Sequence, residues 1–204
     1  MNTYRKQARL LALTALTSLL LVAGCAQENI KQEAVTRDTY TSVKPEIEVH
    51  DSVQLMFTQA LTYLQQQEYP QGIALLETLI ARENRLAAPY VNLGIAYSRT
   101  GKNKMAELNF NKALKLDVGH AVANNELGLL YRKTGRFRAA KTVYQNALIQ
   151  HPDYLPVRKN LGILCELYLR DFACAMEQYQ AYLQYAPEEE TVARWAAELK
   201  QRTQ

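Results

Sequence analysis

The sequence predicts an all-α protein built from repeated helix pairs, and three observations support this. The segments that begin at Asn92 and Glu126 share a Leu-Gly pair, a tyrosine, a glycine and an alanine at an offset of 34 residues. Apolar residues within each copy recur at steps of three and four, which is the spacing of one face of an α-helix. Gly101 and Gly135 interrupt this spacing and suit the left-handed position that ends a helix.

Two further copies extend the pattern along the chain. A third copy begins at Asn160, where Cys165 replaces the tyrosine. Its second half stays in register only if one residue is added, and we place that residue in "YLRD", residues 168–171. A degenerate copy begins at Leu55 and precedes the others. Each pair buries only the face that meets its neighbour, so a stack of several pairs is needed for stability.

Glycines also recur in the middle of the first helix of three pairs, at Gly94, Gly128 and Gly162. A glycine inside a helix costs up to about 1 kcal/mol relative to alanine. That cost is tolerable where two helices must approach closely. We therefore expect these glycines to face small residues on the second helices, namely Ala106, Ala140 and Ala175.

Residues 188–204 predict a capping helix at the end of the array. Val192, Trp195, Ala196 and Leu199 fall on one face. Acidic residues occupy its first turn and basic residues its last, which suits the helix dipole. Stacked repeats need such a terminal cap for solubility. We expect Trp195, the only tryptophan, to anchor the cap in the core, with an interaction hot spot as the alternative.

The 34-residue period and the Leu-Gly, Tyr, Gly, Ala and Pro positions resemble the tetratricopeptide repeat. The resemblance spans residues 53–187 and implies a right-handed superhelix of about four repeats, at 53–86, 87–120, 121–154 and 155–187. It also implies a concave groove, lined by the first helix of each pair, that holds a peptide segment of a protein partner.

The N-terminus predicts export and lipidation. A basic start with Arg5, Lys6 and Arg9 precedes an uncharged run at residues 10–23, which is too short to span a bilayer. "VAGC", ending at Cys25, resembles the bacterial lipobox. The resemblance implies removal of a signal peptide, residues 1–24, and palmitate-type acyl chains on Cys25, with Ala26 favouring the outer membrane. The alternative is an uncleaved anchor helix.

Residues 25–52 are polar and are expected to form a flexible tether.

The resemblance also implies which side chains line the concave groove. The expected partner-binding residues are Asn92, Ile95, Asn125, Leu129, Arg132, Lys159 and Ile163. Alternatively, Ile95, Leu129 and Ile163 only pack between helices. Residues 132–141 contain a basic cluster that could contact lipid headgroups or an acidic partner, or could form a solvated turn between helices.

Two cysteines remain beyond the lipidation site. Cys165 and Cys174 lie about one helical turn on either side of the expected turn in the fourth pair. An exported chain meets an oxidising compartment, which permits a disulfide between them. The alternative is two buried thiols that pack as small hydrophobic groups.

The residue pattern also excludes several classes of function. The sequence contains no phosphate-binding glycine loop, no nucleophile elbow and no cluster of ligands at metal-binding spacing, so we expect no enzyme, no metal and no cofactor. From Cys25 onward 21 basic residues meet 20 acidic ones, which argues against nucleic-acid binding. A small-molecule substrate is not expected either.

The expected function is that of a protein-binding scaffold. Its membrane contact would be the lipid anchor, and its location the periplasmic side of the outer membrane. It would assist assembly of an envelope complex such as a pilus or secretion machine. The alternative is an accessory component of a TonB- or Tol-like energy-coupling system.

Overall fold

The structure is a computed structural model that describes residues 51–204. This part of the chain is entirely helical apart from its turns, which confirms the predicted all-α fold. The helices are α2 (Asp51–Gln65), α3 (Tyr69–Arg82), α4 (Ala87–Arg99), α5 (Asn103–Leu116), α6 (Ala121–Lys133), α7 (Phe137–Gln150), α8 (Leu155–Ile163), the π-helix η2 (Leu164–Leu169), α9 (Phe172–Tyr185) and α10 (Glu190–Thr203).

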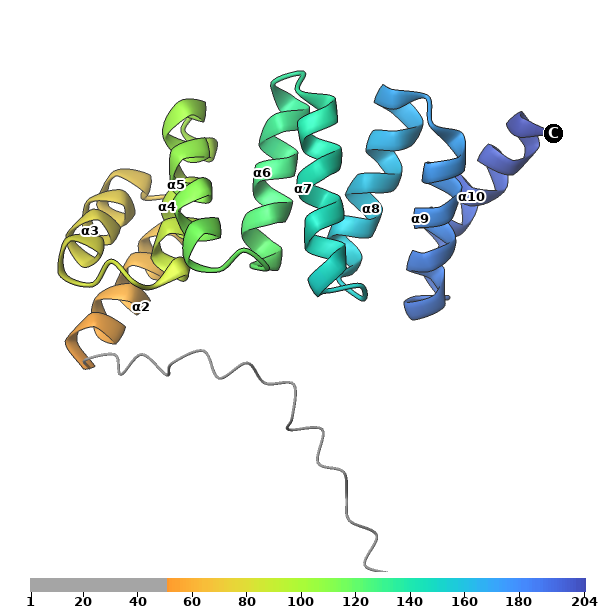
Figure 1. Cartoon of the computed structure of the whole chain (residues 1–204). Coiled ribbons are helices and arrows are strands. Elements are labelled where there is room, and N and C mark those ends of the chain that lie inside the picture. Colours follow the sequence, from red (N-terminus) through yellow and green to blue (C-terminus); the bar gives the residue numbers. More distant parts are fainter. Residues whose placement is uncertain (1–50) are drawn as a thin grey trace, which may run out of the picture. The chain divides into compact units, whose positions relative to one another are not determined.

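The helices form pairs that stack side by side in chain order (Figure 1). α2 packs on α3, α4 on α5, α6 on α7, and α8 with η2 on α9, while α10 packs on α9 at the end. The predicted signal peptide and Cys25 lie outside the described residues. α2 begins at Asp51, so the last two residues of the predicted tether are helical. An acidic residue in the first turn favours a helix start there.

Each pair turns at a residue in the left-handed conformation. Gly101 and Gly135 have φ angles of 78° and 76°, which confirms the role predicted for both glycines. Gln67 and Arg170 occupy the same position in the first and last pairs, with φ angles of 63° and 55°. A left-handed residue at the end of a helix lets backbone N–H groups beyond it reach the last free carbonyls.

The extra residue of the last pair coincides with the π-helix η2, whose last two residues, Tyr168 and Leu169, belong to the segment predicted from the sequence. In the α4–α5 turn the N–H of Lys102 donates to the carbonyl of Tyr97, five residues back. In the last turn the N–H of Asp171 donates to the carbonyl of Cys165, six residues back. The inserted residue is therefore held in η2, because the wider π-helix accommodates it, and the turn keeps its left-handed residue at Arg170.

The mid-helix glycines lie at close helix contacts, as predicted, but their neighbours differ from the prediction. A Cβ atom added to Gly128 would lie 2.2 Å from Cε1 of Tyr144. The equivalent distances are 2.6 Å from Gly94 to Phe110 and 2.4 Å from Gly162 to Tyr179. Aromatic rings, not the predicted alanines, are thus the nearest groups. Ala106, Ala140 and Ala175 are fully buried elsewhere in the same interfaces.

α10 covers the end of the stack. Val192 and Leu199 are fully buried against α9, and Trp195 is half-buried with its ring centroid 5.8 Å from that of Tyr179. Trp195 therefore packs in the core of the cap, as expected from the sequence. The opposite face of α10 is polar and exposed.

Candidate functional site

The first helices of the pairs lie together on one side of the array. α2 contacts α4, α4 contacts α6, and α6 contacts α8. The second helices of neighbouring pairs show no comparable contact within the described residues. The stack therefore bends towards the first helices, and we call the side formed by α4, α6 and α8 the concave face. The seven predicted groove residues all lie on these three helices.

At the centre of this face, Asn125 is a structural residue. It is 7% exposed, its Nδ2 donates to Oε1 of Glu126 at 3.2 Å, and its Oδ1 accepts from Nδ2 of Asn160 at 2.8 Å. The second bond ties α6 to α8. Replacing Asn125 would remove both hydrogen bonds, each of which contributes about 0.5–1.5 kcal/mol to stability. Asn125 is thus unsuited to test partner binding separately from stability.

The predicted groove residues on α4 and α8 are half-buried. Nδ2 of Asn92 donates to the carbonyl of Ala88, one turn back on α4, at 2.9 Å. Ile95 is half-buried and packs against two buried clusters, which favours the packing alternative for this residue. Lys159 and Ile163 are half-buried on α8.

Leu129 lines a pocket between α4 and α6. The pocket has a volume of about 330 Å³ and is lined by Ser98, Arg99, Glu126, Leu129, Leu130 and Lys133. Burial raises the pKa of Glu126, and the nearby positive charge of Arg99 opposes that rise in part. The pocket therefore combines an apolar floor with two basic side chains and one partly desolvated acid.

Arg99 is a site residue that the sequence reasoning missed. It precedes Lys133 by 34 residues and takes the same place at the end of a first helix. The repeat offset could have identified it, because equivalent positions of stacked repeats lie side by side. The next repeat has Leu167 at this position, so the basic residues at the ends of the first helices are limited to Arg99 and Lys133 in these three repeats.

The basic cluster at residues 132–141 does not form a single patch. Arg136 donates to both carboxylate oxygens of Glu107, at 2.8 and 2.7 Å, and its guanidinium stacks on the ring of Tyr131. Lys141 pairs with Asp171. The cluster thus spreads over two repeat junctions and the concave face, which favours the interpretation as a turn between helices over a lipid-binding patch.

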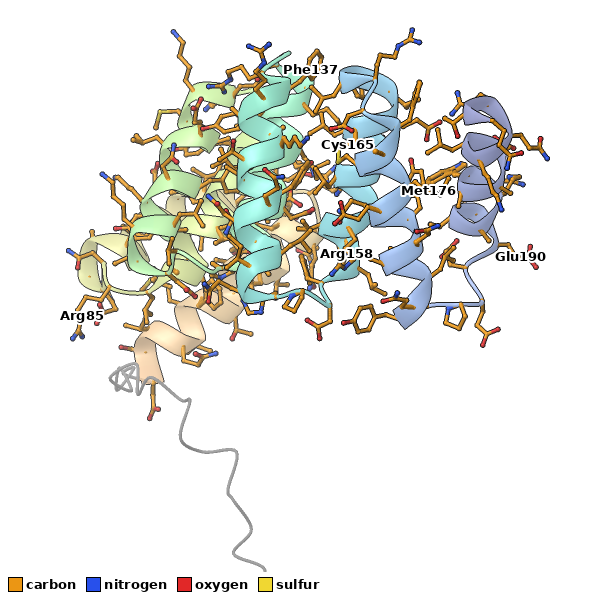
Figure 2. All side chains as sticks on the ribbon, turned by 45° about the vertical axis from the view of Figure 1, so that its right-hand side comes forward. Arg85, Phe137, Arg158, Cys165, Met176 and Glu190 are labelled. Atoms are coloured by element: carbon orange, nitrogen blue, oxygen red, sulfur yellow. A yellow bond between two sulfur atoms is a disulfide. The ribbon has the colours of Figure 1, made fainter. Side chains whose placement is uncertain are left out.

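Cys165 and Cys174 form a disulfide in the structure. Their Cα atoms are 5.9 Å apart, and the bond joins η2 to α9 across the last turn. Cys165 is fully buried inside the fourth pair (labelled in Figure 2). The carboxylate of Asp171 lies close to both sulfur atoms, but it is held by Lys141 and by the backbone N–H of Cys174. This arrangement fits a structural crosslink rather than a metal site.

No helix among residues 51–204 is both long and apolar enough to cross a membrane. The concave face presents apolar, amide and charged side chains around the pocket between α4 and α6.

The fold and this face define a class of protein, and comparison with known families agrees. Two models of the tetratricopeptide repeat match the chain, over residues 87–117 and residues 125–190. The chain therefore contains tetratricopeptide repeats over these residues, and its helix pairs form the predicted superhelical array. Proteins of this class act as protein-interaction scaffolds. No curated protein matches the sequence.

Solved structures show the same fold in several bacterial proteins. PilF of Pseudomonas aeruginosa has 23% identity and a TM-score of 0.67, over 74% of this chain and 70% of that chain. MamA of Desulfovibrio magneticus RS-1 has 20% identity and a TM-score of 0.65, over 76% and 86%. A tetratricopeptide repeat protein of Parabacteroides merdae has 19% identity and a TM-score of 0.65, over 74% and 59%.

Proposed function

We propose that this protein is a lipid-anchored scaffold on the periplasmic side of the outer membrane, which binds a protein partner on its concave face and assists assembly of an envelope complex such as a pilus. The observation that carries the proposal is the combination of a lipobox-like "VAGC" at residues 22–25 with a tetratricopeptide array. The fold shared with PilF supports the choice of a pilus.

In this proposal, a lipid anchor and a polar linker hold the partner-binding array near the membrane. Two or more acyl chains on Cys25 would hold the chain stably at a membrane surface, whereas one chain binds only weakly. About 25 polar residues after Cys25 would then give the array an r.m.s. reach of roughly 25–30 Å from that surface. The array does no chemistry in this proposal and needs no cofactor or metal; it positions its partner.

Lipidation is tested by labelling cells with a fatty-acid analogue. The wild-type protein should carry the label and Cys25→Ala should not. The matched control removes the other two cysteines, through Cys165→Ala with Cys174→Ala, and should keep the label. Label that survives Cys25→Ala, or that disappears in the control, contradicts acylation of Cys25.

Partner identity is tested by crosslinking in intact cells of the native bacterium, followed by mass spectrometry. Capture of pilus or secretin subunits, together with loss of surface pili when the gene is deleted, would support the proposal. Capture of TonB- or Tol-like subunits with normal piliation would favour the energy-coupling alternative. Lys159→Ala is a suitable probe of the concave face, because Lys159 makes no ion pair with a described residue.

A further inference from the structure

A second pocket opens between α7 and α9, on the side of the array opposite the concave face, and α8 lies beneath it. Its volume is about 550 Å³, which is within the range of roughly 300–1,000 Å³ typical of ligand pockets. Gln145, Ile149, Ala173 and Glu177 are exposed at its rim, and Leu161 of α8 is buried at its floor. A ligand can therefore enter this pocket from solvent.

At the two preceding repeat junctions a tyrosine bridges the equivalent helices. Tyr97 of α4 donates from its hydroxyl to Glu77 of α3, and Tyr131 of α6 donates to Glu107 of α5 at 3.1 Å. Each ring therefore spans from the first helix of one pair to the second helix of the pair before it. Where Tyr97 is present, the equivalent pocket between α3 and α5 has a volume of only about 170 Å³.

The last junction lacks this tyrosine. Cys165 occupies its position, and the sulfur of Cys165 is bonded to that of Cys174, which lines the pocket on α9 (Cys165 is labelled in Figure 2). Because the cysteine is held to α9 and carries no ring, no aromatic group extends from this position towards α7. The larger volume of this pocket is therefore explained by the absent ring.

The polar group that meets the tyrosine hydroxyl in the earlier pairs has a counterpart here. Gln145 occupies the position of Glu77 and Asn111 in the repeat pattern. The carboxylate of Glu77 accepts from Tyr97, and the side chain of Asn111 forms a hydrogen bond with Tyr131. Gln145 lines the pocket, and its side chain makes no hydrogen bond with a described residue. The pocket thus keeps the hydrogen-bonding partner of a tyrosine but lacks the tyrosine itself.

The other walls of the pocket favour an aromatic ligand. Leu148 and Leu161 supply apolar surface. Arg158, labelled in Figure 2, is fixed at two points: its Nε donates to the carbonyl of Pro152 at 2.6 Å, and its Nη1 donates to Oε1 of Gln178 at 3.2 Å. A guanidinium held beside apolar surface attracts the face of an aromatic ring more than it attracts an aliphatic side chain.

We propose that this pocket receives a tyrosine side chain from a segment of a partner protein, which takes the place that Tyr97 and Tyr131 fill at the earlier junctions. The ring would lie against Leu148 and Leu161, and its hydroxyl would donate to Oε1 of Gln145. The inference goes beyond the proposed function, because this site lies opposite the concave face. The array would then hold two partner segments at once, one on each side.

The first test titrates the ¹⁵N-labelled full-length protein with N-acetyl-tyrosinamide and follows its amide resonances by NMR. Saturable shifts should appear at the residues that line the pocket. N-acetyl-phenylalaninamide should bind about two- to tenfold more weakly, because it lacks one hydrogen bond, and N-acetyl-leucinamide more weakly still. Gln145→Leu should remove the difference between the tyrosine and phenylalanine probes and leave the affinity for the phenylalanine probe within about twofold.

Blocking variants show whether the probe enters this pocket. Ala173→Arg places a long side chain at the exposed rim, removes no buried group and should prevent binding. The matched control Gln180→Arg adds the same side chain at an exposed position of α9 outside the pocket, and should change the affinity less than about twofold. Cys165→Tyr with Cys174→Ala restores the ring of the earlier repeats. If its circular-dichroism melt shows a folded array, it should not bind the tyrosine probe.

The second test captures the partner in cells of the native bacterium. Ile149 is 72% exposed at the rim, so a photoreactive p-benzoyl-phenylalanine at this position lies beside the entrance. Mass spectrometry should identify a crosslinked segment of another protein that contains a tyrosine. Replacing that tyrosine by alanine, or introducing Ala173→Arg into this chain, should abolish the crosslink, whereas Gln180→Arg should preserve it.

The proposal is overturned if the tyrosine probe binds no better than the phenylalanine or leucine probe, if Ala173→Arg leaves its affinity unchanged, or if Gln180→Arg weakens it equally. Capture of nothing, of a segment without tyrosine, or of a second copy of this chain would also overturn it. Lipidation, piliation and the effect of Lys159→Ala on the concave face are measured independently. Failure of the pocket tests alone removes this inference, and failure of those assays alone removes the proposed function.

Discussion

Lys141 and Asp171 form an ion pair across the last repeat junction, with 2.8 Å between Nζ and Oδ2. One repeat earlier, Glu107 and Arg136 hold the same positions with the charges exchanged, and their closest atoms are 2.7 Å apart. Both pairs join the second helix of one repeat to the turn of the next. The two junctions therefore have the same geometry, but the acidic and basic partners have exchanged places.

Asp171 combines this ion pair with a helix cap. Its Oδ1 accepts from the backbone N–H of Cys174, in the first turn of α9, at 3.1 Å. Asp171→Asn should keep the cap and lose the ion pair, which lowers the free energy of unfolding by at most about 1 kcal/mol because the pair is partly exposed. Asp171→Ala should lose a further 0.5–2 kcal/mol or so with the cap. Urea denaturation measures both, and equal losses would show that Asp171 does not act as a cap.

The same ion pairs predict how stability depends on pH. The hydrogen bond from Lys141, and then the backbone N–H of Cys174, lower the pKa of Asp171 below its ordinary 3.8. The hydrogen bond from Arg136, followed by that from Tyr131, lowers the pKa of Glu107 below its ordinary value of 4.5. A carboxylate with a lowered pKa stabilises the fold above its unfolded pKa, and this contribution is lost as pH falls through the folded value. The stability difference between wild type and Asp171→Asn should thus be constant above about pH 5 and shrink below pH 4. A difference that grows on acidification would contradict this sign.

Gly128 is predicted to resist even the smallest substitution. Alanine would normally favour the helix by up to about 1 kcal/mol, but its Cβ would overlap the ring of Tyr144. We expect Gly128→Ala to lower the free energy of unfolding by about 1–3 kcal/mol, and Gly128→Leu by more. In a Tyr144→Leu background the cost of Gly128→Ala should largely disappear, as a double-mutant cycle by chemical denaturation would show. Additive effects would mean that the two residues do not clash.

Arg170 offers a substitution that should stabilise the protein. It holds the left-handed position of the last turn with φ = 55°, where a non-glycine residue is strained by about 1–2 kcal/mol. Arg170→Gly should raise the free energy of unfolding by up to about 1 kcal/mol, after the greater entropy of glycine in the unfolded chain is subtracted. The matched control Gly135→Ala, at φ = 76°, should lower it. Thermal melts showing no difference between these variants would argue against strain at this position.

The disulfide between Cys165 and Cys174 predicts how the protein responds to alkylation and how much stability it loses on reduction. Alkylation of the denatured, unreduced protein should leave Cys165 and Cys174 unmodified, as measured by intact mass. Because the bridge closes a loop with a sequence separation of 9, reduction should cost about 2–3 kcal/mol in the chain-entropy model. Cys165→Ala with Cys174→Ala should show no further loss on reduction. Alkyl groups added to both cysteines without reductant would exclude the bridge.

The repeated helix pairs, the left-handed glycines and the close helix contacts could all be predicted from the order of residues alone. These features were readable because each depends on one residue type at a regular spacing. A left-handed backbone angle favours glycine at positions 101 and 135, and the close approach of Tyr144 favours a residue without a side chain at Gly128. The distances along two antiparallel helices permitted a crosslink between Cys165 and Cys174, but two buried thiols were the favoured interpretation, and the bridge is seen only in the structure.

Only the tertiary structure decided how the side chains of neighbouring repeats meet. The inserted residue is accommodated by the π-helix η2, and the bond that closes the turn spans one residue more than in the other pairs. Asn125 forms a buried link to Asn160, which the repeat pattern does not predict. Nη1 of Arg132 and the hydroxyl of Tyr144 have no partner among the described residues, whereas the carboxylate of Glu166 accepts from Tyr179 and Arg202. Such contacts depend on three-dimensional distances between residues 10 to 40 positions apart in the sequence. A repeat pattern does not predict them, because the positions that face each other are those at which the copies differ.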